Sequence, residues 1–132
     1  MDAEQKKKLV LDAMDAFLRS DSEESAKYLK DDATWWICRS LSGKLPNLRS
    51  KQQIIERNAG AKTLFPEGLK TALRHVYCDG DTVIVEFSNR GKTANGKIYD
   101  QDYCAVFVLE GDKIKEIREH QDSLHVHQTF FS

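Results

Sequence analysis

The sequence predicts an α+β domain in which helices come first and a curved sheet follows. Before Pro66, apolar residues recur at intervals of three and four, whereas from Leu69 onward they alternate with polar residues. Because the order is not strand, helix, strand, we expect an α+β fold in which a curved sheet wraps around helices packed on one of its faces. A chain of 132 residues supports one hydrophobic core, so residues 1–132 are expected to form a single domain.

Three capping motifs place the helices. They are Asp2 with Gln5, Asp21 with Glu24, and Ser50 with Gln53. In each pair, the first side chain can accept a hydrogen bond from the backbone three residues on and so satisfy a free N–H at the helix start. The first helix is expected over residues 3–19. The second is short, with Leu29 in its apolar stripe, and the third must end before Pro66, because proline has no N–H to continue it.

The strands follow from composition and alternation. The segment "ATWWIC", residues 33–38, is aromatic and β-branched and predicts the first strand. Four later segments alternate between apolar and polar residues and are joined by "DGD", "GKTANG" and "EGD". They are "LKTALRHVYC", "TVIVEFSN", "KIYDQDYCAVFVL" and "KIKEIREHQ". These segments predict an antiparallel meander, with a hollow between its concave face and the helices that can take a small molecule.

Composition and charge narrow the range of partners. The 20 basic and 21 acidic residues are scattered along the chain, and a net charge of −1 gives no basic patch for nucleic acid or an anionic membrane. No apolar run is long enough to span a bilayer. The three cysteines, Cys38, Cys78 and Cys104, form no CxxC pair and lie in apolar strand-like segments, which favours reduced thiols and a cytoplasmic location.

Strand parity sorts the polar side chains of the meander into two faces. Successive residues of a strand point to opposite sides of the sheet, so residues two apart share a face. Periodicity alone leaves open which face of each strand points inward. The pairs that share a face are Phe87 with Asn89, Tyr103 with Phe107, and Glu119 with Gln121, the last pair opposite to His120.

Three segments carry a resemblance to a known superfamily: "DDATWW", "DGDTVIVEFSNRGKTANGKIY" and "DYCAVFVLEGDKIKEIREHQDS". Through them the chain resembles the nuclear transport factor 2-like superfamily, in its SnoaL-like polyketide cyclase and ketosteroid isomerase-related branch. The resemblance implies a cone-shaped α+β barrel, in which a curved mixed or antiparallel sheet wraps around three N-terminal helices. Commonly, it implies a homodimer through the outer sheet face as well. It also implies a hydrophobic small molecule as ligand and chemistry that uses no cofactor.

The same resemblance selects Glu119. This residue matches the position of a pocket Asp in limonene-epoxide hydrolases of the superfamily, and the match turns Glu119 and Gln121 inward. The other polar positions of that hydrolase site fall on Phe87 and Asn89, so the likeness does not extend to epoxide hydrolysis. The general-base position of the ketosteroid isomerases falls on Ile37, which cannot transfer a proton.

A carboxyl group at Glu119 suits acid–base catalysis if it lies in an apolar hollow. Desolvation there would raise its pKa toward neutrality, which a general acid or base needs. The structural alternative is that Glu119 forms an ion pair with Arg74 or Arg118 and only fastens strands together, since ion-pair networks imitate catalytic surroundings.

Aromatic and amide side chains are the candidates for the walls of the hollow. We expect Trp35, Trp36 and Phe87 to hold a ring system, with Tyr103 acting beside Glu119. The alternative is that these aromatic residues belong to the core. Further ligand contacts are predicted for His75, Asn89 and Gln121.

Histidines are concentrated in "REHQDSLHVHQ", which contains His120, His125 and His127. A His-x-His pair can chelate a metal, but a third fixed ligand is missing from the pattern, and we expect no metal site. The segment "SLHVHQTFF" is interpreted as a tail beyond the last strand, with its histidines at a dimer face, where they would make the interface pH-sensitive.

The sequence is compatible with two functions. The first is a pocket protein that catalyses proton transfer, isomerisation or cyclisation of a hydrophobic, oxygenated substrate. The second is a non-catalytic ligand-binding or dimerisation module, in which the protein's own side chains fill the cone.

Overall fold

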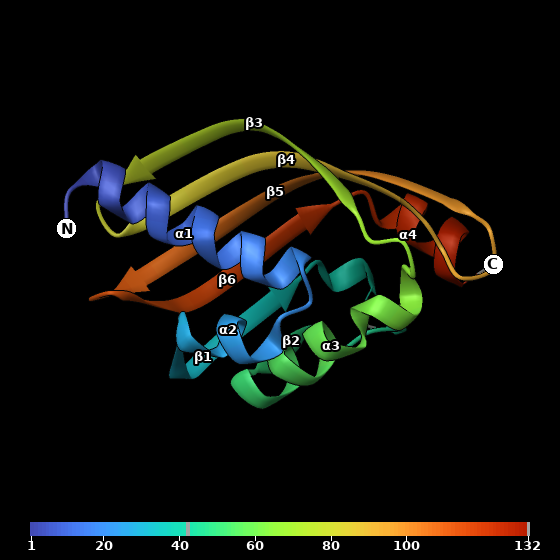
Figure 1. Ribbon diagram of the computed structural model, residues 1–132, viewed down its shortest axis with the longest axis horizontal. Helices are drawn as coiled ribbons and strands as arrows, with labels where there is room; N and C mark the ends of the chain where they lie inside the picture. Colours follow the sequence, from blue (N-terminus) through green and yellow to red (C-terminus); the bar gives the residue numbers. More distant parts are fainter. Residues whose placement is uncertain (42, 132) are drawn as a thin grey trace.

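The computed structural model, in which residues 1–41 and 43–131 are described, confirms the α+β class (Figure 1). Helices lead, and a long antiparallel meander follows. The main elements are α1 (Ala3–Leu18), α2 (Ser22–Lys27), β1 (Leu29–Ile37), β2 (Leu48–Ser50), α3 (Lys51–Leu64), β3 (Lys70–Asp79), β4 (Thr82–Lys92), β5 (Ile98–Glu110), β6 (Lys113–Gln121) and α4 (Ser123–Phe130). A short 3₁₀ turn, Arg39–Leu41, follows β1.

The six strands within residues 1–41 and 43–131 form one sheet, in the order β2-β1-β6-β5-β4-β3. Strands β3 to β6 make the predicted meander, in which each strand is antiparallel to the next. Strand β1 lies parallel to β6, so the sheet is mixed. The three-residue strand β2 pairs with β1 and was not predicted, because so short a segment has no visible alternation.

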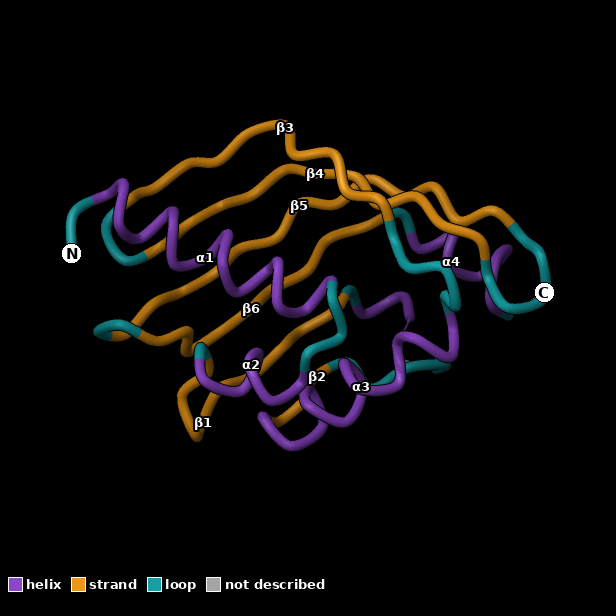
Figure 2. Tube along the Cα trace, in the orientation of Figure 1, coloured by secondary structure: helices purple, strands orange, loops and turns teal. Residues whose placement is uncertain are grey.

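The helices α1, α2 and α3 lie on the concave side of the curved sheet (Figure 2). The alternation of burial along β4 shows which side chains meet them, since Val83, Val85, Phe87 and Asn89 are buried and their neighbours are not. The core continues into α1 through Val10 and Ala13 and into β6 through Ile114 and Ile117, all of them almost fully buried. We call this helix-facing side the inner face.

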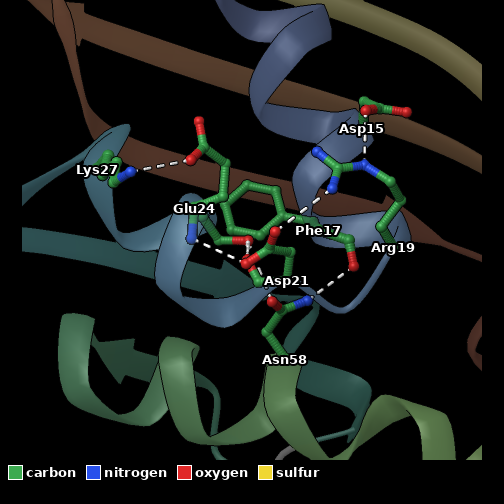
Figure 3. A network of polar contacts seen from close by, with 8 residues as sticks. Asp15, Phe17, Arg19, Asp21, Glu24, Lys27 and Asn58 are labelled. Atoms are coloured by element: carbon green, nitrogen blue, oxygen red, sulfur yellow. Dashed lines mark hydrogen bonds and ion pairs between the residues drawn. The ribbon is translucent and has the colours of Figure 1, made fainter.

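A partly buried amide joins the three N-terminal helices (Figure 3). Asn58 of α3 donates through Nδ2 to the backbone oxygen of Phe17 at 2.7 Å, beside the last turn of α1. Its Oδ1 accepts a hydrogen bond of 3.1 Å from the Ser25 hydroxyl of α2, which is fully buried. One side chain thus fixes where the C-terminal end of α1 lies, and with it the ring of Phe17.

Two boundaries differ from the sequence prediction. The second helix ends at Lys27, and Leu29 begins β1 instead of extending the helix. Tertiary packing prevails here, because Leu29 is 1% exposed in the main core.

The segment interpreted as a tail forms helix α4. Asp122 caps it, since the carboxylate accepts hydrogen bonds from the backbone N–H groups of Leu124 and His125. The ring of Phe130 packs against Phe65 and Tyr99, which holds the helix against the end of the sheet. The aspartate was visible in the sequence, but the packing partners lie far away along the chain.

None of the described helices combines the length and apolar character that crossing a membrane requires. The three cysteines are free thiols, and each is partly buried.

Candidate functional site

Glu119 lies on the inner face of β6. In the β5–β6 ladder it is opposite Ala105, and Gln121 is opposite Tyr103, while the preceding inner residue Ile117 is fully buried. His120 points to the other side of the sheet, where the centroid of its ring lies 5.2 Å from that of the Trp36 ring. Strand alternation therefore brings together Glu119, Gln121 and Tyr103, as the parity of the sequence allows.

A chain of hydrogen bonds connects these side chains across two strands. Gln121 donates through Nε2 to the Glu119 Oε2 atom at 3.1 Å, and its own Oε1 accepts from the Tyr99 hydroxyl at 3.3 Å. The Tyr99 and Tyr103 hydroxyls are hydrogen-bonded to each other at 2.5 Å. We refer to Glu119, Gln121, Tyr99 and Tyr103 as the Glu119 cluster.

The environment shifts the acid–base behaviour of the cluster. Burial raises the pKa of Glu119 above its ordinary value, although the positive charges of Arg49 and Arg57 oppose the shift. Burial also raises the pKa of Tyr99 to about 12, and it raises that of Tyr103, where the charge of Glu119 adds to the effect. Both phenols are therefore neutral hydrogen-bond donors near pH 7, beside a carboxyl group that is easier to protonate than usual.

The ion pairs suggested as a purely structural role for Glu119 are formed by other residues. Arg74 pairs with Asp102 at 3.1 Å, and Arg118 pairs with Glu116 at 2.9 Å, both on the surface. Among the described residues, no basic side chain lies within ion-pairing distance of Glu119. The carboxyl group is left with the amide of Gln121 as its direct partner.

Two aromatic contacts flank the cluster. Phe87 stacks on Tyr103, with ring centroids 5.0 Å apart and planes inclined by 8°. The rings of Phe17 and Trp35 pack edge to face, with their centroids 5.3 Å apart. Asn89 is also on the inner face, but its amide oxygen accepts a hydrogen bond of 2.6 Å from Thr71, which ties it to the neighbouring strand. Phe87 and Trp35 thus have positions that suit walls, whereas the Asn89 oxygen is already engaged.

Two of the predicted ligand contacts lie on the wrong side of the sheet. Trp36 is adjacent to Trp35 in sequence, and alternation turns it to the outer face, against His120. His75 is exposed on β3, opposite Glu86 of β4, and stacks on Tyr77. Neither side chain reaches the Glu119 cluster, so we remove both from the candidate site.

Three residues of the site were missed by sequence reasoning. Tyr99 could have been found, because it lies four residues before Tyr103 and shares its face. Arg49 and Arg57 had no such signal. Arg49 lies on the unpredicted strand β2, and Arg57 lies on α3, whose side chains reach the sheet only through tertiary packing.

The side chains in and around the Glu119 cluster are partly accessible to solvent. Glu119, Gln121, Tyr103 and Trp35 are each half-buried, although they lie on the inner face. Two hollows of about 350 and 430 Å³ occur elsewhere, one lined by Lys30, Lys51 and Lys113 and the other by the 93–96 turn and Pro66. Neither hollow touches Glu119, so a ligand at the cluster would enter between side chains that lie close together in this structure.

The C-terminal histidines have separate surroundings. His125 accepts a hydrogen bond of 3.1 Å from the backbone N–H of Asp100 and stacks on Tyr99, whereas His127 contacts Phe131. Within the described residues, no three His, Cys, Asp or Glu side chains gather as a metal site would require.

Comparison with known proteins identifies the family. The sequence profile of the SnoaL-like domain matches residues 10–117, which is most of the chain. The chain belongs to the SnoaL-like domain family. No significant match was found among curated proteins.

Solved structures agree with the SnoaL-like fold. A Burkholderia pseudomallei protein of unknown function, described as ntf2-like, is 18% identical with a TM-score of 0.85, and the alignment covers 100% of both chains. A Bacillus subtilis protein provisionally assigned as an isomerase is 22% identical, with a TM-score of 0.84 over 98% of this chain and 96% of that one. TerC, co-crystallised with polyporic acid, is 18% identical, with a TM-score of 0.83 over 97% and 99%. At these identities the likeness establishes the fold.

Proposed function

We propose that this SnoaL-like protein binds a hydrophobic, oxygen-bearing small molecule on its inner face and moves a proton on it, as a cofactor-independent isomerase or cyclase. The observation that carries the proposal is the Glu119 cluster, in which a carboxyl group with a raised pKa lies beside two neutral phenols. The provisional assignment of a structural neighbour as an isomerase and the polyporic acid bound by TerC support this choice of ligand class.

The chemistry requires only groups that the chain supplies. Glu119 as carboxylate removes a proton from a carbon next to a carbonyl, and the electron pair moves to the carbonyl oxygen. Tyr103 turns its hydroxyl proton from Tyr99 to that oxygen and donates to it as negative charge develops. Return of the proton to a different carbon completes an isomerisation. Alternatively, the carbon attacks a second carbonyl and closes a ring, and the alkoxide formed there takes the proton back from Glu119.

Deuterium exchange tests proton transfer before the natural substrate is known. The protein would be incubated in D₂O with a panel of steroid and aromatic polyketide ketones, and NMR would follow deuterium incorporation next to each carbonyl. We expect exchange with at least one ketone and its loss in Glu119→Gln. Equal exchange in the wild type and in this variant, or none with either, would reject the catalytic role.

A second candidate is a ligand-binding module without catalysis. It is favoured by the close packing around the cluster, since neither of the two hollows described above reaches Glu119. A thermal-shift screen with polyporic acid, steroids and aromatic polyketides separates the candidates, because a ligand that stabilises the fold without turnover indicates binding alone.

The proposed function includes an oligomeric state and a location in the cell. We propose a homodimer through the outer sheet face, where Tyr77 is 51% exposed and Val106 and Val108 are half-buried. Light scattering should give a dimer for the wild type and a monomer for Val106→Asp. The free thiols support a cytoplasmic location.

A further inference from the structure

Arg49 is a buried, charged side chain on the inner face of the sheet. It is 6% exposed, with its guanidinium nitrogens still reached by solvent, and within the described part of the chain it forms no hydrogen bond or ion pair with another residue. Burying a cation without a partner is unfavourable, and natural proteins usually pair or neutralise such a group. A buried arginine in this state is suited to a partner that arrives from outside.

The register of the sheet places Arg49 next to a second unused donor. In the β1–β2 ladder Arg49 is directly opposite Trp35, so the two side chains leave the sheet on the same face. The indole Nε1 of Trp35 is buried and has no acceptor among the described residues. Two neighbouring donors therefore lack an acceptor, and both are donor-only groups.

The charges around Arg49 indicate the charge of the acceptor that would bind there. Arg57 of α3 adds positive charge close to Arg49, and the pKa of Arg49 is lowered to about 10, chiefly by burial, so the guanidinium stays charged near neutrality. Glu119 is near enough to interact with Arg49 through its field but not to form an ion pair with it. An acceptor placed at Arg49 would lie close to the Glu119 carboxyl group.

We propose that Arg49, assisted by the Trp35 N–H, binds an anionic oxygen of the ligand, so that the oxygen-bearing ligand of the proposed function also carries an acidic group. A planar guanidinium matches a carboxylate or enolate, because it can donate two parallel hydrogen bonds. Arg57, which is exposed on α3, attracts the anion from solvent. This inference rests on the proposed ligand-binding function but is independent of catalysis by Glu119.

The test compares an acid with its neutral isostere. Binding of 2-naphthoate and 2-naphthamide would be measured by calorimetry at pH 7 with the wild type, Arg49→Met, Arg49→Lys and Arg118→Met. Arg118 is the control, because it lies on the outer face and pairs with Glu116. We expect the wild type to prefer the acid at least tenfold, Arg49→Met to lose this preference, Arg49→Lys to keep part of it and Arg118→Met to keep all of it.

The outcomes separate this inference from the proposed function. Equal binding of acid and amide by the wild type, or an acid preference that survives Arg49→Met, overturns the inference and leaves ligand binding intact. Binding of neither probe contradicts the inference and ligand binding together. Thermal unfolding adds a readout without ligand: Arg49→Met should be at least as stable as the wild type, and a clear loss of stability would make Arg49 a structural residue instead.

Discussion

Gln121 and Glu119 lie two residues apart on one face of β6, and the amide of the first donates to the carboxylate of the second at 3.1 Å. The same amide group accepts from the Tyr99 hydroxyl, so it connects the acid of β6 to the phenols of β5. Glu119 is consequently held by a neutral group, and its charge is not cancelled by a direct ion pair within the described residues. Four predictions follow from this arrangement and from the packing around it.

The stability of the protein should depend on the ionisation of Glu119. Its pKa is raised in the folded state, so between its unfolded value and its folded value the native chain holds a proton that the unfolded chain has released. Stability is thus greatest below the unfolded pKa and falls as the pH rises through the folded pKa. Glu119→Gln should match the wild type near pH 4 and be more stable than it at pH 8, as measured by thermal unfolding.

A control substitution at Glu110 should change the stability in the opposite direction. The pKa of Glu110 is lowered by its contacts with Lys30 and Lys115 on the surface. Glu110→Gln should therefore be slightly less stable than the wild type at neutral pH, and the difference should vanish on acidification. A pH-independent effect of Glu119→Gln would show that the carboxyl group is not shifted.

Removal of the Tyr103 hydroxyl should separate activity from stability. Tyr103→Phe keeps the ring that stacks on Phe87 and deletes one hydrogen bond to Tyr99, so unfolding free energy should fall by about 1 kcal/mol. If Tyr103 stabilises negative charge on the ligand, deuterium exchange should fall about 100-fold. Tyr77→Phe, on the exposed outer face, is the control. Unchanged exchange in Tyr103→Phe would remove this residue from the mechanism.

The amide of Asn58 should be important for the position of the Phe17–Trp35 contact. Asn58→Ala removes two hydrogen bonds, one to the Phe17 carbonyl and one from the Ser25 hydroxyl, which should cost about 1–3 kcal/mol of stability. The two groups keep their bonds with the Ser20 N–H and the Asp21 carbonyl. Trp35 fluorescence should change as well, because Phe17 contacts its ring. Gln52→Ala, whose side chain bonds Glu56 on the exposed face of the same helix, should have little effect on either measurement.

Two glycines should respond to alanine in opposite directions. Gly60 lies inside α3 with open space where a Cβ would project, so Gly60→Ala should raise the stability by about 1 kcal/mol through helix propensity. At Gly91 a Cβ would come within 2.9 Å of the Gly68 carbonyl oxygen and 2.8 Å of the Leu69 side chain. Gly91→Ala should therefore lower the stability by about 1–3 kcal/mol. Urea unfolding measures both, and equal effects at the two sites would contradict the packing described around β4.

Local patterns predicted the framework because they depend on neighbours in sequence. The capping boxes at Asp2 and Ser50 form as expected, since each side chain reaches a backbone group three residues away. Parity likewise placed Glu119 and Gln121 on one face before the inner face was known, because alternation is a property of any strand. The resemblance to the SnoaL-like branch then selected that face, and the structure has both side chains there.

Tertiary structure alone decided which distant residues surround the acid. Arg49 lies beside Trp35 because β2 pairs with β1 in one particular register, which no local pattern in a three-residue strand specifies. The same dependence on contacts turned Leu29 into a strand residue and folded the expected tail into α4 against Phe65 and Tyr99. The sequence by itself determined the three N-terminal helices, the meander and the shared face of Glu119 and Gln121. The charged and aromatic surroundings of Glu119 depended on hydrogen-bond register and on packing between segments far apart in the chain.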